Sequence, residues 1–175
     1  MNAGIWHRAG AWLLRATMVL GAVTGCGGAP VLDCAQQPQD RHHGNAGCLV
    51  VDGGRLLMVQ QRITGLWALP GGTAEPGERA VCTAWRETRE ETGLEVRVGE
   101  LLHRFDNGFR LYRCTPAEPQ QAPSAAATGP GDALEIADLG WLDRHQRAQV
   151  PWRFEGQREL IEGLVSRREA EGERR

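Results

Sequence analysis

Short apolar runs alternate with glycine-containing turns through the middle of the chain. Apolar runs bounded by glycine-containing turns are typical of β-strands joined by tight turns. Two β-hairpins are predicted, and their turns are Asp52-Gly53-Gly54 and Asp106-Asn107-Gly108. The strands are expected at residues 47–51 and 55–60 in the first hairpin, and at residues 94–105 and 109–114 in the second.

Two other segments have helical spacing. Residues 78–91 follow Pro76-Gly77 and end before Gly93, which suits the left-handed position at a helix C-terminus. Glu78 is expected in the first turn, where a negative charge complements the helix dipole. Residues 153–169 predict a closing amphipathic helix, because their apolar positions recur at helical spacing between arginines and glutamates.

The remaining segments connect these elements. Residues 66–70 predict a short extended segment that leads into Gly71-Gly72, and residues 136–142 predict the last strand. Between them, residues 115–131 are rich in Pro, Ala, Gln and Gly and predict a long loop. The order of strands, helix, strands and helix predicts an α+β fold, and the length suits a single catalytic domain.

The predicted helix at 78–91 carries a concentrated negative charge. Glu87, Glu90 and Glu91 are three and four residues apart, so their side chains share one helix face. Carboxylates held this close repel one another, so a proton or a bound cation is needed to relieve the repulsion. Carboxylate oxygens are hard ligands, which favours Mg²⁺ or Mn²⁺. The alternative is a solvated acidic helix face.

The segment from Gly72 to Leu94 resembles the signature of the Nudix hydrolase family. In that signature a Gly, a Glu, an Arg-Glu pair, a Glu-Glu pair and a Gly stand at fixed spacings, and an apolar residue ends it. The residues that fall in register are Gly72, Glu78, Arg86, Glu87, Glu90, Glu91, Gly93 and Leu94. Thr88 departs from the pattern, because a larger apolar residue is commoner there, and this is expected to affect packing rather than chemistry. Residues 67–72 also resemble the family's lead-in.

The resemblance implies a fold, an activity and a cofactor. The fold would be the Nudix α/β/α sandwich with a mixed β-sheet. The activity would be Mg²⁺-dependent (or Mn²⁺-dependent) hydrolysis of a diphosphate linkage in a nucleoside diphosphate derivative or a related organic pyrophosphate. The metal would be held by Glu87, Glu90, Glu91 and the backbone carbonyl of the Gly71-Gly72 turn, assigned to Gly72.

The resemblance also suggests roles for single residues. Glu87 or Glu90 would serve as the base. Arg86 is placed in the catalytic set with them, where it would pair with Glu78 or a helix carboxylate and so have its own side chain fixed, with a surface ion pair as the alternative. Glu135, between the long loop and the last strand, is a candidate for a further ligand, with an ordinary exposed glutamate as the alternative. Contacts to a base or sugar are expected from the 115–131 loop, Arg62, Phe105 and Phe109.

The N-terminus has the features of an export signal. Residues 1–15 carry two arginines and no acidic residue, and residues 16–24 are short and mostly apolar. Cys26 follows Val23-Thr24-Gly25, which resembles a bacterial lipobox in which Cys26 would be lipidated. The apolar run is shorter than the roughly 20 residues that span a bilayer. An uncleaved anchor, a plain signal peptide and a cytosolic arm are the alternatives.

These features predict three segments and a location. Residues 1–25 would form a signal peptide of the lipoprotein type, residues 26–43 a tether, and residues 44–170 the Nudix hydrolase domain with its C-terminal helix. The protein is then expected in the cell envelope, lipid-anchored on the periplasmic side, and Gly27 after Cys26 favours the outer membrane. A cytoplasmic protein is the alternative.

Four cysteines remain after Cys26, an even number that two disulfides would use in an oxidising compartment. They are Cys34, Cys48, Cys82 and Cys114. Three connectivities are open, and the pairs Cys34–Cys48 and Cys82–Cys114 are favoured. Free buried thiols are one alternative, and a zinc site with His42 and His43 is another.

Composition narrows the range of partners. The net charge of −2 supplies no basic field for nucleic acid, and all 20 basic residues are arginine, which excludes lysine-dependent chemistry. The expected partners are a small-molecule pyrophosphate and, through the lipid anchor, a membrane, with no nucleic acid. The rival function is a membrane-tethered module that uses a Nudix fold to bind or sense a ligand without turnover.

Overall fold

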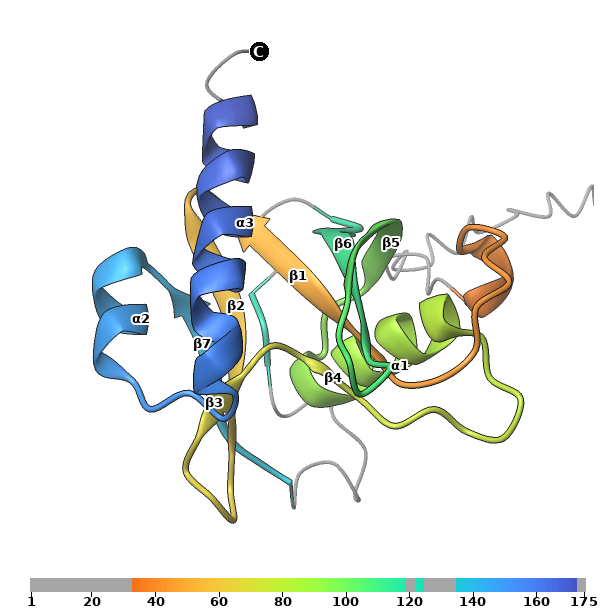
Figure 1. Ribbon diagram of the computed structural model, residues 1–175, viewed down its shortest axis with the longest axis horizontal. Coiled ribbons are helices and arrows are strands. Elements are labelled where there is room, and N and C mark those ends of the chain that lie inside the picture. Colours follow the sequence, from red (N-terminus) through yellow and green to blue (C-terminus); the bar gives the residue numbers. More distant parts are fainter. Residues whose placement is uncertain (1–32, 119–121, 125–134, 173–175) are drawn as a thin grey trace, which may run out of the picture.

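The computed structural model describes residues 33–118, 122–124 and 135–172 (Figure 1). The predicted signal peptide, Cys26 and most of the predicted 115–131 loop lie outside the described residues. The strands are β1 (Ala46–Asp52), β2 (Arg55–Gln61), β3 (Trp67–Ala68), β4 (Gly71–Gly72), β5 (Val96–Arg104), β6 (Arg110–Pro116) and β7 (Ile136–Leu142). The helices are α1 (Ala80–Thr92), α2 (Arg144–Gln149) and α3 (Arg158–Gly172), with 3₁₀ turns at Cys34–Gln36 and Glu155–Gln157.

The strands form one mixed sheet. Its main order is β3-β2-β1-β6-β5, and the remaining two strands attach as β4 on β1 and β7 on β2. β1 and β6 are parallel, whereas the other neighbours are antiparallel. A parallel pair needs a crossover between its strands, and here the chain from β2 through α1 to β5 supplies it.

The sheet carries a core on each face. In β1, Cys48 and Val50 pack into the core that includes α1, whereas Leu49 packs into the opposite core with Ile161 and Val165 of α3. This alternation follows from the two-residue period of a strand. The helices α1 and α3 therefore cover opposite faces, and the fold is an α/β/α sandwich (Figure 1).

The central elements match the sequence predictions, with one correction. Both hairpins form at the expected turns, and the last strand has the expected bounds. The helix α1 is capped by Gly93, whose φ is 67°. However, α1 starts at Ala80, and Glu78 precedes its N-cap Arg79, so the expectation of Glu78 in the first turn is wrong. Glu78 instead accepts hydrogen bonds from side chains of the helix that follows it.

The closing helix predicted at 153–169 is present, but it starts later than expected and a 3₁₀ turn precedes it. After α2, Trp152 packs into the core and Phe154 is exposed, and α3 begins only at Arg158. Ile161 and Val165 form the buried apolar face of α3. The aromatic residues that precede α3 belong to an extended connection that packs beside β3.

The tether predicted over residues 26–43 is too long at its C-terminal end. Gln37 is buried, donates its side-chain amide to the carbonyl of Val96, and accepts the amide N–H of Val98. Asp40 accepts a hydrogen bond from the hydroxyl of Tyr112. Residues 33–43 are therefore part of the folded domain.

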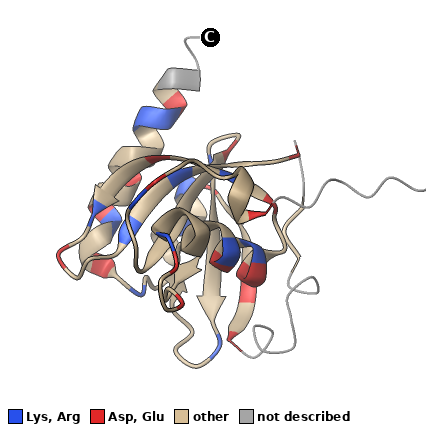
Figure 2. Ribbon diagram, turned by 90° about the vertical axis from the view of Figure 1, so that its right-hand side faces the viewer, with Lys and Arg blue, Asp and Glu red and all other residues tan. Residues whose placement is uncertain are grey.

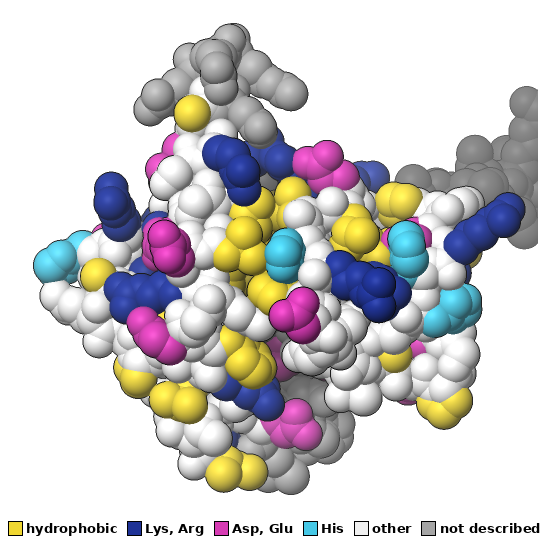
Figure 3. Space-filling view, viewed as in Figure 1, with side chains coloured by type: hydrophobic (Ala, Val, Ile, Leu, Met, Phe, Trp, Pro, Cys, Tyr) yellow, Lys and Arg dark blue, Asp and Glu magenta, His cyan; other side chains and the backbone are white. Residues whose placement is uncertain are grey.

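The surface is mixed in charge. In the described residues, acidic and basic segments are interspersed along the ribbon in this view (Figure 2). Apolar side chains gather in the hollow beside α3 (Figure 3). Within the residues that the structure describes, no helix is both long and apolar enough to span a membrane.

Candidate active site

The site is built on the Gly71-Gly72 turn. These two residues form β4, which pairs with Ala46 and Gly47 at the start of β1. Gly71 has a φ of 148°, a conformation that residues with a side chain rarely adopt. A Cβ atom on Gly72 would overlap the carboxylate of Glu87. Glycine at this position therefore leaves space in which the carboxylate can lie against the backbone.

The helix α1 presents its glutamates to this turn. One face of the helix is buried along its whole length, through Ala80 and Ala84 in its N-terminal half and Thr88 and Thr92 in its C-terminal half. Glu91 accepts a hydrogen bond from the backbone N–H of Gly71, with a nitrogen–oxygen distance of 2.8 Å. This contact fixes the last glutamate of the helix to the Gly-Gly turn.

Arg86 holds the other carboxylates. Its guanidinium contacts Glu78 at 2.9 Å, Glu87 at 3.0 Å and Glu90 at 2.7 Å. It also donates a hydrogen bond to the carbonyl of Thr73, the residue directly after β4. The expected pairing of Arg86 with Glu78 and helix carboxylates is thus present. Arg86 thereby offsets the negative charges of Glu78, Glu87 and Glu90.

The ionisation of the site follows from burial and from Arg86. Burial raises the pKa of Glu91 to about 8, which outweighs the hydrogen bond from Gly71. Burial also raises the pKa of Glu87 against the opposing charge of Arg86. Burial acts in the same direction on Glu78, but hydrogen bonds from Arg86 and its other donors prevail and lower its pKa. The pKa of Arg86 is raised, chiefly by its hydrogen bonds to Glu78, so it stays charged.

The donor set suits a hard divalent cation. Glu87 lies in the space left by Gly72, and Glu87 and Glu91 both have raised pKa values, which a nearby positive charge would reverse. Among the described residues, however, no three His, Cys, Asp or Glu side chains stand close enough to form a ready metal cluster. The contacts explain this, since Glu87 and Glu90 turn to Arg86 whereas Glu91 turns to Gly71.

Two other residues were predicted to contribute to the site, Glu135 and Arg62. Glu135 is exposed, yet its charge contributes to the raised pKa of Glu91, so the two carboxylates are near each other. Its role as a further ligand stays a prediction. Arg62 instead donates to the backbone carbonyl of Ile136 and does not line the pocket beside Glu91.

A pocket of about 200 Å³ opens over Glu91 and the Gly-Gly turn. Aromatic side chains from three separate parts of the chain contribute to its walls. They are Trp67 of β3, Phe105 and Phe109 of the second hairpin, and Trp152 and Phe154 of the connection before α3. Asn45, Asn107 and Gln157 add amide groups to the wall. Such a space accepts a planar ring with polar edges next to a charged group.

The sequence prediction missed the residues that precede α3. Trp152, Arg153 and Phe154 line the pocket, although residues 153–169 were expected to form one amphipathic helix. The aromatic–cation–aromatic order of this run was a usable signal. Its distance of more than sixty residues from Glu91 hid the connection.

Both disulfides lie near the site, but their connectivity differs from the expected one. The structure joins Cys34 to Cys82 and Cys48 to Cys114, with Cα–Cα distances of 5.2 and 5.4 Å. The favoured pairs Cys34–Cys48 and Cys82–Cys114 are therefore wrong. Cys48 and Cys114 stand on the parallel neighbours β1 and β6, a pairing that the sequence did not reveal. The zinc alternative is also wrong, because its cysteines are consumed in these bonds.

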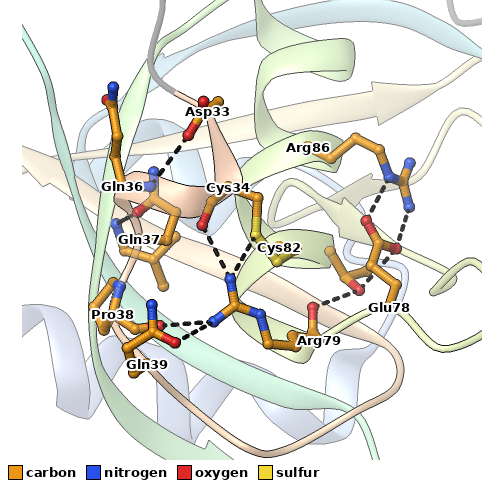
Figure 4. Close-up of a disulfide and its surroundings, with 12 residues drawn as sticks. Asp33, Cys34, Gln36, Gln37, Pro38, Gln39, Glu78, Arg79, Cys82 and Arg86 are labelled. Carbon is orange, nitrogen blue, oxygen red and sulfur yellow. Dashed lines mark hydrogen bonds and ion pairs between the residues drawn. A yellow bond between two sulfur atoms is a disulfide. The ribbon is translucent and has the colours of Figure 1, made fainter.

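The Cys34–Cys82 disulfide clamps the N-terminal segment to the first turn of α1 (Figure 4). Arg79 reinforces the clamp, because its guanidinium donates to the carbonyl and sulfur of Cys34 and to the carbonyl of Pro38. Glu78 and Arg86 lie on the other side of Arg79 in the same view (Figure 4). Arg79, which reinforces the disulfide, directly follows Glu78, the carboxylate that accepts a hydrogen bond from Arg86.

Fold and site together define a class: an α/β/α sandwich in which one helix offers its carboxylates to a Gly-Gly turn at the base of a pocket. The sequence matches the NUDIX domain over residues 41–164. The chain belongs to the Nudix family.

Individual relatives agree with this assignment. A MutT-like protein from Streptomyces ambofaciens is 36% identical over 88 residues, which are 47% of this chain and 57% of the relative. Human diphosphoinositol polyphosphate phosphohydrolase 2 is 40% identical over 58 residues, 33% of this chain and 32% of that protein. The matched regions thus span between about a third and somewhat over half of these relatives.

Solved structures share the fold. A Nudix-family hydrolase from Clostridium perfringens superposes with a TM-score of 0.57 at 16% identity, covering 71% of this chain and 97% of that one. A UDP-X diphosphatase gives a TM-score of 0.55 at 23% identity, covering 70% and 62%. The expected Nudix fold with a mixed sheet is confirmed.

Proposed function

We propose that this domain hydrolyses the diphosphate linkage of a nucleoside diphosphate derivative with the help of Mg²⁺ or Mn²⁺. The observation that carries the proposal is the position of Glu91. It lies at the base of an aromatic pocket, hydrogen-bonded to Gly71 and one helical turn from Glu87. A substrate whose ring occupied the pocket would bring its phosphates to these carboxylates.

The cation would be held by Glu87, Glu90, Glu91 and the carbonyl of Gly72, with Glu135 within reach of Glu91. When bound, it supplies positive charge that neutralises the phosphates and favours attack on phosphorus. Arg86 orients Glu87 and Glu90 through its contacts with both. The aromatic walls orient the ring and exclude water from one side of the substrate.

Glu87 is our candidate for the base that accepts a proton from the attacking water. Its raised pKa brings it closer to neutral pH than an ordinary glutamate, which improves a general base. Glu90 is the more exposed of the two and has the shorter contact with Arg86, so its charge is more strongly committed to that ion pair.

The pocket favours a nucleotide over an inositol pyrophosphate. Its walls offer aromatic faces, on which a planar base stacks well, and amide groups that can bind base edges. Within the pocket lining that the structure describes, there is no cluster of cations of the kind that a multiply phosphorylated inositol would need. We therefore expect a substrate with one ring and few phosphates.

A substrate panel with the purified domain tests this proposal. ADP-ribose, UDP-glucose, diadenosine tetraphosphate and an inositol pyrophosphate would each be incubated with Mg²⁺, with EDTA as the control. We expect metal-dependent cleavage of at least one nucleotide, reduced about 100-fold or more in Glu91→Gln. Turnover of none would refute the hydrolase proposal, and tight binding without turnover would favour the sensor function.

We also propose that the chain is exported and anchored by a lipid on Cys26. The lipobox-like sequence supports this, and so do two disulfides in the domain, because disulfides persist in oxidising compartments. Metabolic labelling with a fatty acid would detect the anchor, and Cys26→Ser is the control. An unlabelled protein that retains Met1 would contradict it.

A further inference from the structure

Among the described residues, the wall of the pocket carries one cation and one carboxylate. Of the described residues that line it, only Glu91 and Arg153 carry a charge. Glu91 stands on α1, whereas Arg153 stands on the connection between α2 and α3, which passes beside β3 (Figure 1). The positive charge of Arg153 acts on Glu91 across this space.

The backbone of Arg153 is fixed to the strand that leads into the Gly-Gly turn. Its N–H donates to the carbonyl of Trp67 at 2.8 Å, and the N–H of Trp67 donates to the carbonyl of Pro151 at 2.8 Å. Trp67 and Trp152 form a parallel bridge. β3 therefore holds the backbone of Arg153 in place. The same strand leads into the Gly71-Gly72 turn, which donates a hydrogen bond to Glu91.

Among the residues that the structure describes, the side chain of Arg153 is positioned by an aromatic ring and not by an acidic partner. Its guanidinium lies over the ring of Phe154, 4.9 Å from the ring centre. Within the described part of the chain, no carboxylate or carbonyl accepts a hydrogen bond from it. A guanidinium held on an aromatic face keeps its hydrogen-bond donors directed outward, where they can bind a phosphate in bidentate fashion.

Other arginines near the site are already engaged. Arg86 contacts three carboxylates, and Arg110 donates to the carbonyls of His43 and Gly108. Arg62 donates to the carbonyl of Ile136. A protein cation would add to the positive charge that the metal supplies to a diphosphate, and Arg153 is the arginine among the described residues that line the pocket.

We propose that Arg153 binds the diphosphate group of the substrate where it approaches Glu91 from the pocket, and so determines affinity for phosphorylated ligands. This assignment rests on the proposed function for the identity of the ligand. It makes Arg153 a binding residue that touches substrate, whereas Arg86 acts on the carboxylates of α1. The ring of the substrate would then lie against the aromatic walls of the pocket.

Binding measurements test Arg153 without requiring turnover. Uridine, adenosine and guanosine would each be titrated beside the corresponding non-hydrolysable α,β-methylene diphosphate, with tryptophan fluorescence as the signal, since Trp67 and Trp152 line the pocket. We expect the diphosphate to bind more tightly than its nucleoside. Arg153→Gln should reduce that preference about 10- to 100-fold, the usual effect of losing a charged hydrogen bond.

Arg158→Gln is the matched control. Arg158 also stacks on an aromatic ring, that of Trp152, but it does not line the pocket. The control should keep the preference for the diphosphate, and Arg153→Lys should fall between Arg153→Gln and the unmodified protein. Thermal unfolding of all variants would show whether the fold is retained.

The kinetic result separates this inference from the proposed function. If a panel substrate is hydrolysed, Arg153→Gln should raise KM more than it lowers kcat. If nothing is hydrolysed but the preference for diphosphates depends on Arg153, the binding assignment stands and the hydrolase proposal fails. An unchanged preference in Arg153→Gln, or no binding of any diphosphate, would overturn the assignment.

Discussion

Gly47 and Gly71 pack backbone against backbone, because they are paired across β1 and β4 and a Cβ atom on Gly71 would overlap the Cα atom of Gly47. A Cβ atom on Gly47 would lie 2.5 Å from the carbonyl oxygen of Pro70 and 2.8 Å from the ring of Phe109. Both glycines are thus required by close approach. The contact therefore fixes the position of the Gly71-Gly72 turn relative to Glu91.

Gly47→Ala tests this contact. The added methyl group must push the turn away from β1, so we expect a loss of about 2–3 kcal/mol of stability and a weakened hydrogen bond from Gly71 to Glu91. Denaturant unfolding and metal-dependent activity would measure the two effects. Gly163→Ala is the control, because Gly163 lies in α3 with no atom within 4 Å of the added Cβ, and it should be neutral or slightly stabilising. Equal stability of the two variants would contradict the close approach.

Arg86→Lys should impair the metal site while the fold survives. Lysine keeps the charge but cannot contact Glu78, Glu87 and Glu90 together, so the carboxylates lose their orientation. We expect Mg²⁺ affinity or activity to fall about 10- to 100-fold, as is usual when the partners of metal ligands are removed. Arg89→Lys, on the same helix, is the control, since Arg89 is exposed and pairs with Glu95 outside the site. A Mg²⁺ titration that does not distinguish the two variants would rule out this orienting role.

The two disulfides should differ in accessibility. Cys48 and Cys114 are almost fully buried, whereas Cys34 is partly exposed at the surface. Mild reduction should therefore open Cys34–Cys82 first, and mass spectrometry of alkylated peptides would identify the bond. Each bond closes a loop of 48 or 66 residues, so its loss should cost about 4 kcal/mol in the chain-entropy model. Peptides that link Cys34 to Cys48 would contradict the connectivity.

The cysteine pairs show which parts of the fold a sequence can predict. The hairpins, α1 and β7 were predictable because their signals are local: a turn sequence, a helical spacing and a C-terminal glycine. The parallel pairing of β1 with β6 brings together residues more than sixty positions apart, and no local pattern reports it. Cys48 and Cys114 depend on that pairing, and so the predicted connectivity failed.

The same division applies to the site. Glu87, Glu90 and Glu91 could be placed on one helix face by their spacing alone. Their present orientations depend on Arg86 and Gly71, and these compete with any shared cation for the carboxylates. Arg153 reaches the pocket only because the connection after α2 pairs with β3, which is again a contact between distant segments.

Glu162→Gln should destabilise the protein in a pH-dependent way. Arg147 is buried and forms two hydrogen bonds of 2.9 Å with the carboxylate of Glu162. The hydrogen bonds from Arg147 lower the pKa of Glu162 from its ordinary value of 4.5. A lowered pKa in the folded state stabilises above pH 4.5, and this contribution disappears as the pH falls through the folded-state value.

We therefore expect Glu162→Gln to cost about 2 kcal/mol at pH 7, and the difference to shrink below pH 4.5. Urea unfolding across this pH range measures it. Glu155→Gln is the control, because Glu155 is an exposed partner of Arg158 and its loss should cost less than about 0.5 kcal/mol. A pH-independent difference would show that the ion pair is not the source of the stability.

Glu91→Gln should stabilise the metal-free protein while it removes the metal-dependent activity. Burial raises the pKa of Glu91 from 4.5 to about 8, so above pH 8 the folded state must hold a buried charge that the unfolded state exposes to water. As the pH falls from 8 towards 4.5, the folded protein takes up a proton before the unfolded chain does, and the penalty disappears. Glutamine avoids that penalty and still accepts the hydrogen bond from Gly71. In EDTA, the melting temperature of the variant should exceed that of the unmodified protein at pH 9, and the two should converge near pH 5. Saturating Mg²⁺ should reverse the order at pH 9, because only the carboxylate gains a counter-charge. A variant that melts at a lower temperature in EDTA at pH 9 would show that Glu91 is not held as a strained, buried carboxylate.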